Sequence, residues 1–391
     1  MGILARVREM AKVTPLQLTS LALLVIVGAA ILVLPTTISR HLMQSAWMVA
    51  VLFVVGVLPV AWVAASLLRR FPGRSFVGMA RTALGRPAGS GLGLVFSLWW
   101  VLVLAVTGRI LAEFVAFALL DLTPPPVVLS LLGVGTAAVL WRGPVPLARL
   151  AEVATPLIFA TILIWFGLGL REGDMRYLLP IGAEGVPRIL RATLTPVAFG
   201  SSIAAVLLMG KYIQTTRRVG PALYWAVVLV GTVGLMAESL TTLVLGFLRA
   251  TQTLPHFHTA RLVGLAGFVE RVDSTFALGI LLGIFITCGV LLFAVANGVS
   301  ESLSVRRAYR LALGLGVVAF VVLTQVLFPT FAGLVAVLDS WLVPLVALAV
   351  QAGLPLVVLA VARLRGKDGR AGVPRTGPRP RRRYRPRARQ S

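Results

Sequence analysis

The tetrapeptide Gly28-Ala29-Ala30-Ile31 interrupts the first long apolar run of the sequence, and Gly200-Ser201-Ser202-Ile203 interrupts the sixth. Glycine followed by small residues weakens a helix, because glycine is entropically costly in a helix interior and leaves backbone groups uncovered. Within a bilayer, uncovered N–H and C=O groups are tolerated only where they face protein or a polar cavity. Interrupted helices at matching places of two halves are typical of transporter-like binding sites. We therefore expect broken helices 1 and 6 that hold a small ligand near mid-membrane.

The composition indicates an integral membrane protein. Hydrophobic residues make up 58% of the chain and charged residues 13%, which leaves too few polar side chains to cover a soluble protein of this size. The apolar runs repeatedly reach about 20 residues, the length that crosses roughly 30 Å of hydrocarbon. The sequence predicts an all-α membrane domain over 16–361 with ten transmembrane helices, at 16–34, 46–68, 91–119, 126–141, 150–170, 189–210, 221–248, 272–297, 311–328 and 331–361.

The basic residues predict the orientation of these spans, because short cytoplasmic loops retain lysine and arginine. The basic clusters fall in the N-terminal segment 1–15 and in every second loop, which places both termini in the cytoplasm. The residues concerned are Arg6, Arg8, Lys12, Arg69, Arg70, Arg74, Arg81, Arg86, Arg142, Arg149, Lys211, Arg217, Arg218, Arg306, Arg307 and Arg310. The first apolar run is too long for a cleavable signal peptide and is expected to be the first span.

The last segment, 362–391, is rich in arginine, proline and glycine and includes Arg381-Arg382-Arg383. Such a composition cannot bury a core, so we expect a disordered cytoplasmic tail. Anionic lipid of the inner leaflet is the expected contact, since basic residues beside a membrane surface are attracted to it. Nucleic acid is not expected as a partner, because only Tyr384 offers an aromatic ring for base stacking.

Enzyme chemistry and metal binding find little support in the sequence. The single cysteine, Cys288, lies inside the eighth run, and the chain has three histidines. We find no metal-ligand cluster, no phosphate-binding loop and no nucleophile with a nearby histidine. The sequence predicts a protein that is not an enzyme and that needs no cofactor or metal.

Three of the ionisable residues inside the predicted spans are candidates for a role, because charge there is costly and is usually paired or faces a cavity. Arg109 and Glu113 are four residues apart in the third run and share one helix face, so they can pair as a structural tie or as part of a gate. Glu238 in the seventh run has no basic residue at pairing distance along its own helix. For Glu238 we expect either an interhelical pair or a protonated carboxyl.

The two breaks predict a ligand-binding set. Broken helices expose N–H donors that suit a carboxylate, hydroxyl groups supply neutral hydrogen bonds, and a phenyl ring can close over a small side chain. No acidic residue lies in either break, so a zwitterion or a neutral solute fits better than a cation. The expected ligand-binding residues are Gly28, Ala29, Ala30, Ile31, Phe199, Gly200, Ser201, Ser202 and Thr287.

Several short motifs, in order from about residue 13 to 345, carry a family resemblance. They are Thr14-Pro15-Leu16-Gln17-Leu18, the Gly28 break, Ala46-Trp47, Phe71-Pro72-Gly73, Arg109, Leu147-Ala148-Arg149-Leu150-Ala151-Glu152 and Phe268-Val269-Glu270-Arg271-Val272-Asp273. With these motifs the chain resembles the spore germination permease family, the B-type subunits of bacterial germinant receptors.

The resemblance implies a member of the amino acid/polyamine/organocation superfamily with two inverted five-helix repeats, at about 16–170 and 189–361. It also implies a subunit that senses a nutrient such as an amino acid, a sugar or a nucleoside at the inner spore membrane. A-type and C-type subunits would be its partners, and release of monovalent cations would follow. Many family members carry glutamate directly after the glycine of the sixth span, where this chain has Ser201, so no relative's ligand is transferred to it.

Two other functions stay open at this point. A secondary transporter, such as a sodium-coupled amino acid permease, would need carbonyls near the first break and a hydroxyl such as that of Thr287. Proton coupling in similar permeases often relies on a lysine in the fifth span. No lysine occurs between Lys12 and Lys211, so the sequence favours proton coupling less. A structural scaffold would have less need for two matching breaks, and leucine at Gly28 or Gly200 would then damage folding but not a ligand response.

Overall fold

The computed structural model describes residues 12–120, 122–214, 217–263, 272–305 and 308–369, with only the backbone given for 272 and 273. The described part is helical, apart from loops and one isolated bridge between Val13 and Ile213. The first half contains α2 (Pro15–Ser39), α3 (Ala46–Arg70), α4 (Phe76–Leu84), α5 (Arg86–Ala118), α6 (Pro125–Leu140), α7 (Val145–Gly169), η1 (Leu170–Glu172) and η2 (Met175–Leu178). The second half contains α8 (Val186–Gly200), η3 (Ser201–Met209), α9 (Val219–Leu245), η4 (Gly246–Thr251), α10 (Pro255–Leu262), α11 (Val272–Ser302), α12 (Ala308–Leu327), α13 (Phe331–Asp339), α14 (Leu342–Leu348), η5 (Ala349–Gly353) and α15 (Leu354–Leu364).

Nine helices of the described part are long and apolar enough to cross a membrane, which confirms the all-α membrane class. The predicted run 126–141 corresponds to α6, which has 16 residues and is shorter than the other spans. The count of ten spans therefore stays a prediction. Most of the predicted basic tail and the motif residues Phe268–Arg271 lie outside the described residues.

The first helix begins at a motif that the sequence singled out. Thr14 and Gln17 cap α2 reciprocally, since the Gln17 N–H donates to Thr14 Oγ1 at 3.3 Å and the Thr14 N–H donates to Gln17 Oε1 at 3.1 Å. This capping box satisfies two backbone donors that a helix start leaves open. Gln17 Nε2 also donates to Glu152 Oε2 on α7 at 2.8 Å. Two motifs of the resemblance thus join α2 to α7.

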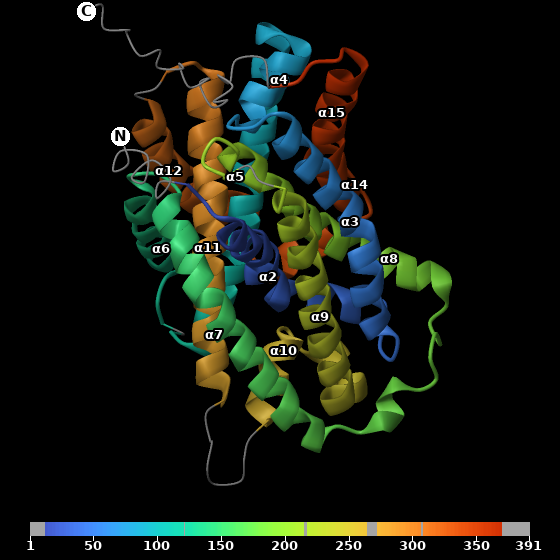
Figure 1. Cartoon of the computed structure of the whole chain (residues 1–391). Coiled ribbons are helices and arrows are strands. Elements are labelled where there is room, and N and C mark those ends of the chain that lie inside the picture. Colours follow the sequence, from blue (N-terminus) through green and yellow to red (C-terminus); the bar gives the residue numbers. More distant parts are fainter. Residues whose placement is uncertain (1–11, 121, 215–216, 264–271, 306–307, 370–391) are drawn as a thin grey trace, which may run out of the picture.

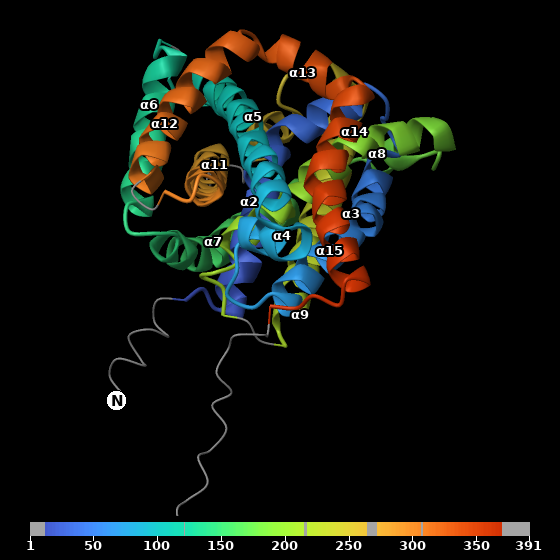
Figure 2. The same ribbon diagram turned by 90° about the horizontal axis from the view of Figure 1, so that it is seen from above.

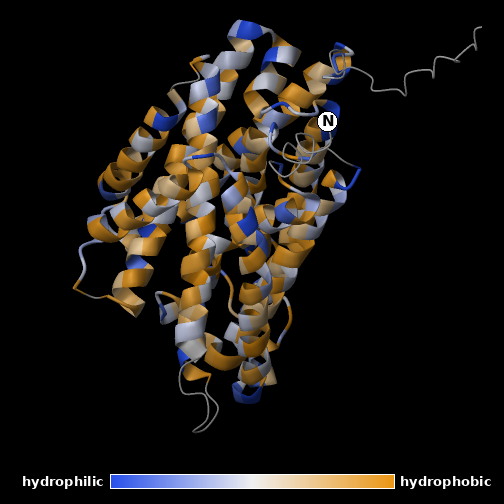
Figure 3. Cartoon of the chain, turned by 60° about the vertical axis from the view of Figure 1, so that its left-hand side comes forward, coloured by the Kyte–Doolittle hydropathy of each residue, from blue (hydrophilic) through white to orange (hydrophobic). Residues whose placement is uncertain are grey.

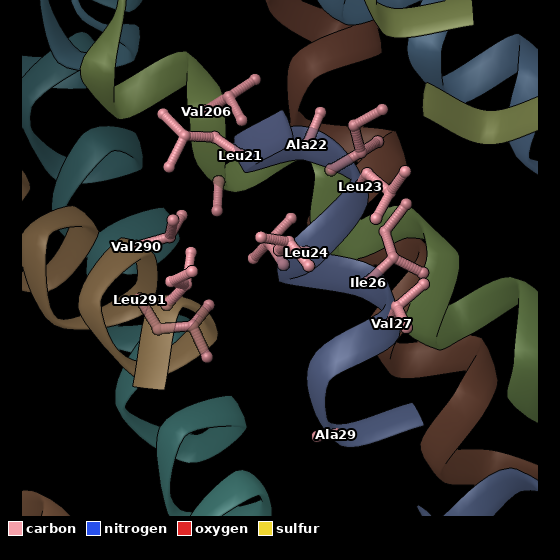
Figure 4. Packing of buried hydrophobic residues seen from close by; sticks show 14 of the residues in the cluster. Leu21, Ala22, Leu23, Leu24, Ile26, Val27, Ala29, Val206, Val290 and Leu291 are labelled. Carbon is pink, nitrogen blue, oxygen red and sulfur yellow. The ribbon is translucent and has the colours of Figure 1, made fainter. Parts of the chain in front are cut away.

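Helices α2 and α11 form the centre of the molecule (Figures 1 and 2). Seen from above, α11 stands among α5, α6, α7 and α12, and α2 lies beside it (Figure 2). Figure 3 shows hydrophobic residues, in orange, along most of the length of the helices. In the core, Leu21 and Leu24 of α2 lie near Val206 of η3 and Val290 and Leu291 of α11 (Figure 4). Helices α4 and α15 lie at one end of the molecule and α10 at the other (Figure 1).

The predicted break at Gly28 is wrong, because α2 is one continuous α-helix from Pro15 to Ser39. Gly28 serves close packing instead. A Cβ atom on this glycine would lie 2.1 Å from Thr287 Oγ1 and 2.6 Å from the carbonyl oxygen of Gly283, both on α11. The small residues therefore let two central helices approach without opening the backbone of either.

The sixth run does change its helix type at the predicted place. The α-helix α8 ends at Gly200, and the next nine residues, Ser201–Met209, continue as the 3-10 helix η3. Stretches of 3-10 helix longer than three or four residues are uncommon. Gly200 itself packs against α3, where an added Cβ would lie 2.4 Å from Val57 Cγ2 and 2.5 Å from Phe53 Cε2.

The last predicted run, 331–361, is wrong at its start. Its first residues form the separate helix α13, and the membrane-spanning helix covers Leu342–Leu364. Two hydroxyl groups explain the division. Thr330 Oγ1 accepts the N–H of Gly333 at 3.1 Å and caps α13, and Ser340 Oγ accepts the N–H of Val343 at 3.3 Å at the start of α14. Pro329 therefore lies in a connection between helices.

Candidate functional site

A central cavity of about 310 Å³ lies between helices from both halves of the chain. Its wall combines α2, α5, α8, η3, α11, α13, α14 and η5. Four of the predicted ligand-binding residues belong to this wall: Ala29, Phe199, Ser202 and Thr287. The remaining wall residues are Val25, Trp99, Leu102, Val103, Val106, Thr107, Thr195, Ala198, Phe328, Val337, Leu338, Leu342, Val343, Pro344, Val346, Ala347 and Gln351.

The hydroxyl groups of the wall already donate their hydrogens to backbone carbonyls. Thr287 donates to Leu24 O at 2.7 Å, and Ser202 donates to Phe199 O at 2.6 Å. Thr107 and Thr195 likewise donate to Val103 O and Leu338 O, at 2.9 Å and 3.0 Å. A ligand therefore finds oxygen lone pairs at these positions rather than donors.

One amide joins the two irregular helices beside the cavity. Gln351 belongs to η5, a π-helical stretch between α14 and α15, and its side chain lies 2.9 Å from Ser201 Oγ at the start of η3. Ser201 Oγ also lies 2.7 Å from Ala198 O. The contact with Ser201 uses the amide oxygen, Oε1, which leaves the Nε2 hydrogens of Gln351 for another acceptor. Gln351 can thus offer one neutral hydrogen bond to a ligand.

The other predicted ligand-binding residues do not reach the central cavity. Gly28 and Ile31 line a small space of about 20 Å³ between α2, α7 and α11. Ala30 borders another space of about 70 Å³ toward α3 and α9. Gly200 faces α3, and Ser201 lies behind the wall against Gln351. Because α2 turns continuously, its four consecutive residues point in different directions and cannot all face one ligand.

The sequence reasoning did not select Gln351 or Trp99. Gln351 is the one uncharged polar residue of Leu342–Leu364, and a lone amide in an apolar span was the available signal. Trp99 carries an indole N–H that is buried without a partner among the described residues. Trp99, α13 and α14 line the central cavity because of the way these helices pack. That packing could not be inferred from the sequence.

Glu238 pairs with Arg249 of η4, a partner that the sequence did not indicate. Both side chains are buried, and Arg249 Nη2 donates to Glu238 Oε2. Arg249 also donates to Ser39 Oγ at 2.9 Å and to Thr242 Oγ1 at 2.5 Å, so the pair ties the end of α2 to α9.

His256 of α10 completes this buried network. Its Nε2 lies 3.5 Å from Glu238 Oε1, and its Nδ1 lies 2.8 Å from Thr241 Oγ1. Burial, together with the positive charge of Arg249, holds the pKa of His256 well below its usual range. The imidazole is therefore neutral at pH 7, which leaves Arg249 and Glu238 as the ion pair of the network.

The expected pair of Arg109 and Glu113 is confirmed, with 2.8 Å between Arg109 Nη2 and Glu113 Oε2. The pair borders a second space, the outer cavity, of about 470 Å³. The central cavity, by contrast, has no ionised side chain among the described residues of its wall.

Solved structures identify the fold. The chain aligns with MHP1, a nucleobase-cation-symport-1 family transporter, in a closed conformation with bromovinylhydantoin bound, at a TM-score of 0.69 and 15% identity over 91% of this chain and 79% of that one. It also aligns with a Na⁺-coupled sialic acid symporter, at a TM-score of 0.64 and 10% identity over 89% and 79% of the two chains. The fold is that of LeuT-fold transporters such as Mhp1.

Sequence comparison gives the family. Spore germination protein YndE of Bacillus subtilis (strain 168) is 25% identical over 303 residues, which cover 74% of this chain and 81% of YndE. The family model described as spore germination protein matches residues 12–328, which is most of the chain. With that match and the transporter-like helical fold, the chain belongs to the spore germination permease family.

Proposed function

We propose that the protein is the nutrient-sensing membrane subunit of a germinant receptor, and that it binds a small solute in the central cavity. The observation that carries this proposal is the cavity of about 310 Å³, because its wall unites residues far apart in sequence, from Val25 to Gln351. Its size falls in the lower part of the range for small-molecule sites. A ligand that contacts several helices at once can favour one arrangement of them over another.

The lining narrows the class of solute. Apolar side chains dominate the wall, and the polar groups are the neutral ones of Thr107, Thr195, Ser202, Thr287 and Gln351. A charge buried here without a partner would be unfavourable. We propose that this cavity takes an uncharged solute or the apolar side chain of an amino acid, and that amino acids are the first class to test.

Membership of the spore germination permease family supports a proposal for the partners and the location. We propose that A-type and C-type subunits of a germinant receptor assemble with this chain in the inner spore membrane, and that ligand binding triggers ion release through the complex. Support for cytoplasmic termini comes from the basic residues of 69–86, which lie near the ends of α3 and α4 at the same end as α15. The tail after 369 is proposed to contact anionic lipid.

A second candidate function is solute transport, which the fold shared with Mhp1 and with the Na⁺-coupled sialic acid symporter favours. The proposed sodium donors support it less. Thr287 keeps oxygen lone pairs that a cation could use, but the neighbouring α2 carbonyls belong to an uninterrupted helix. A cation there would need this stretch of α2 to open.

Thermal stabilisation of the purified protein by amino acids, sugars and nucleosides tests the proposal. The best ligand is then tested for uptake into proteoliposomes with a sodium gradient. Binding without accumulation supports a sensor, whereas accumulation driven by the gradient would make the protein a transporter. A wild type that no member of the panel stabilises would count against the binding proposal.

The variant Gln351→Leu is expected to weaken binding of the best ligand about three- to tenfold, because one neutral hydrogen bond contributes about 0.5–1.5 kcal/mol. Isothermal titration calorimetry measures the change. The matched control is Gln325→Leu on α12, since Gln325 is not part of the cavity wall and its Nε2 is buried without a partner among the described residues. Equal affinities of the two variants would remove Gln351 from the site.

A further inference from the structure

The outer cavity adjoins the central cavity along the same helices. On α5, Val106 lines the central cavity and Arg109, one turn further along, lines the outer one. On α13, Leu338 lines the central cavity and Val335 the outer one. The full wall of the outer cavity is Thr36, Arg40, Arg109, Glu113, Ala250, Thr251, Gln252, Thr253, Pro329, Thr330, Phe331, Ala332 and Val335.

Arg109 is largely buried yet incompletely paired. Its side chain is 11% exposed, Nη2 donates to Glu113 Oε2 at 2.8 Å, and Nη1 donates to Pro329 O at 3.1 Å. The Nε–H is buried without a partner among the described residues. A guanidinium group has five N–H donors in a planar fork that matches a carboxylate. Arg109 therefore has capacity for a further acceptor.

Charges of both signs meet at this wall. Glu113 is 27% exposed and receives one hydrogen bond, from Arg109, in the described part of the chain. Arg40 adds a second positive charge, and its contact with Asp339 is long, at 3.7 Å.

We propose that the outer cavity binds the charged head of a zwitterionic α-amino acid, with its carboxylate on Arg109 and its ammonium group on Glu113. This inference rests on the proposed function and names the charge recognition that the central cavity lacks. Phe331, Ala332 and Val335 of α13 supply an apolar surface for a side chain at the same place.

Occupation of this site acts on α13, which lines both cavities. Arg109 Nη1 holds the carbonyl of Pro329, two residues before α13 begins at Phe331. A ligand carboxylate competes with that carbonyl and with Glu113 for the guanidinium group. Binding in the outer cavity therefore loosens the N-terminal end of α13, whose residues Val337 and Leu338 line the central cavity.

Equilibrium dialysis of the full-length protein with radiolabelled L-leucine tests the proposal, with N-acetyl-L-leucine, L-leucinamide and acetate as competitors. The variant Val103→Trp fills the central cavity, so it should lose only the L-leucine bound there and keep the L-leucine bound in the outer cavity. Arg109→Gln and Glu113→Gln should each weaken this binding at least about tenfold, because charge-assisted hydrogen bonds contribute about 1.5–3 kcal/mol. The matched control is Arg261→Gln, since Arg261 stacks on Phe117 and Phe257 and is not part of the outer wall.

The double variant Arg109→Glu/Glu113→Arg separates recognition from structure. It keeps an ion pair in the more favourable order, so a purely structural pair predicts unchanged binding, and our proposal predicts loss of L-leucine binding with a thermal midpoint near that of the wild type. The proposal is overturned if Val103→Trp abolishes binding that the wild type shows, or if acetate competes as well as L-leucine. It is also overturned if only sugars or nucleosides bind the wild type. If Val103→Trp abolishes binding, or if only sugars or nucleosides bind, this proposal fails and the proposed function stands. A wild type that binds none of the tested solutes overturns both this proposal and the proposed function.

Discussion

Replacing Glu238 by alanine is expected to destabilise the protein by about 3–5 kcal/mol, because it leaves the guanidinium group of Arg249 buried without its counter-charge. Arg249 is fully buried, and its other hydrogen bonds reach only the neutral oxygens of Ser39 and Thr242. His256 cannot take the place of the carboxylate, since it is neutral and has no negative charge to offer. Unfolding in a titration from mild detergent into sodium dodecyl sulfate measures the loss.

The double variant Glu238→Leu/Arg249→Met is the informative comparison. Removing both members of a buried pair is often close to neutral, so the double variant should be more stable than either single variant. Lys211→Ala serves as the control, because Lys211 pairs with Glu301 at 3.6 Å and is 37% exposed. Pairs as exposed as this one typically contribute 1 kcal/mol or less. If the double variant were no more stable than Glu238→Ala, the cost of Glu238→Ala would not come from the unpaired charge of Arg249.

The second large effect is expected for Gly28→Ala, which should destabilise the protein by about 2–3 kcal/mol. The added methyl group would overlap Thr287 Oγ1 at 2.1 Å and the Gly283 carbonyl at 2.6 Å. The backbone atom cannot rotate away, so α2 and α11 must separate, and the hydrogen bond from Thr287 to Leu24 O is strained or lost. Thermal unfolding in detergent measures this change.

Gly167→Ala is the matched control for Gly28→Ala. Gly167 also lies inside a helix, α7, but a Cβ there meets nothing within 4 Å. Alanine is the better helix former, so this variant should be as stable as the wild type or slightly more stable. If Gly28→Ala were equally harmless, the close contact of α2 with α11 would be wrong. Because Gly28 does not line the central cavity, its variant should lose stability rather than ligand selectivity.

Gly28 also shows where prediction from the sequence ends. Small residues in an apolar run are typical both of a broken helix and of a close helix crossing. The sequence does not say which neighbour is present, and here Gly283 and Thr287 of α11 decide for the crossing. At Gly200 the same signal did accompany a change of helix type. The spans themselves were predictable because their apolar length is a property of one segment.

Partners on the same helix were predictable, and partners across helices were not. Arg109 and Glu113 are separated by four residues, so their pairing follows from helix geometry alone. Arg249 reaches Glu238 only because the chain continues as the 3-10 helix η4 beyond α9. Gln351 meets Ser201 across 150 residues of sequence. Contacts of this kind depend on how helices pack and leave no periodic trace in a single sequence.

The nine residues of η3 form a segment whose length depends on its helix type. A 3-10 helix rises about 2.0 Å per residue and an α-helix about 1.5 Å, so rewinding this stretch would shorten it by about 4–5 Å. One end of η3 is Ser201, which Gln351 holds beside the central cavity, and the other end precedes Lys211, whose side chain reaches Glu301 at the far end of α11. A change of winding beside the cavity would therefore shift Lys211 and its contact with Glu301 relative to Ser201.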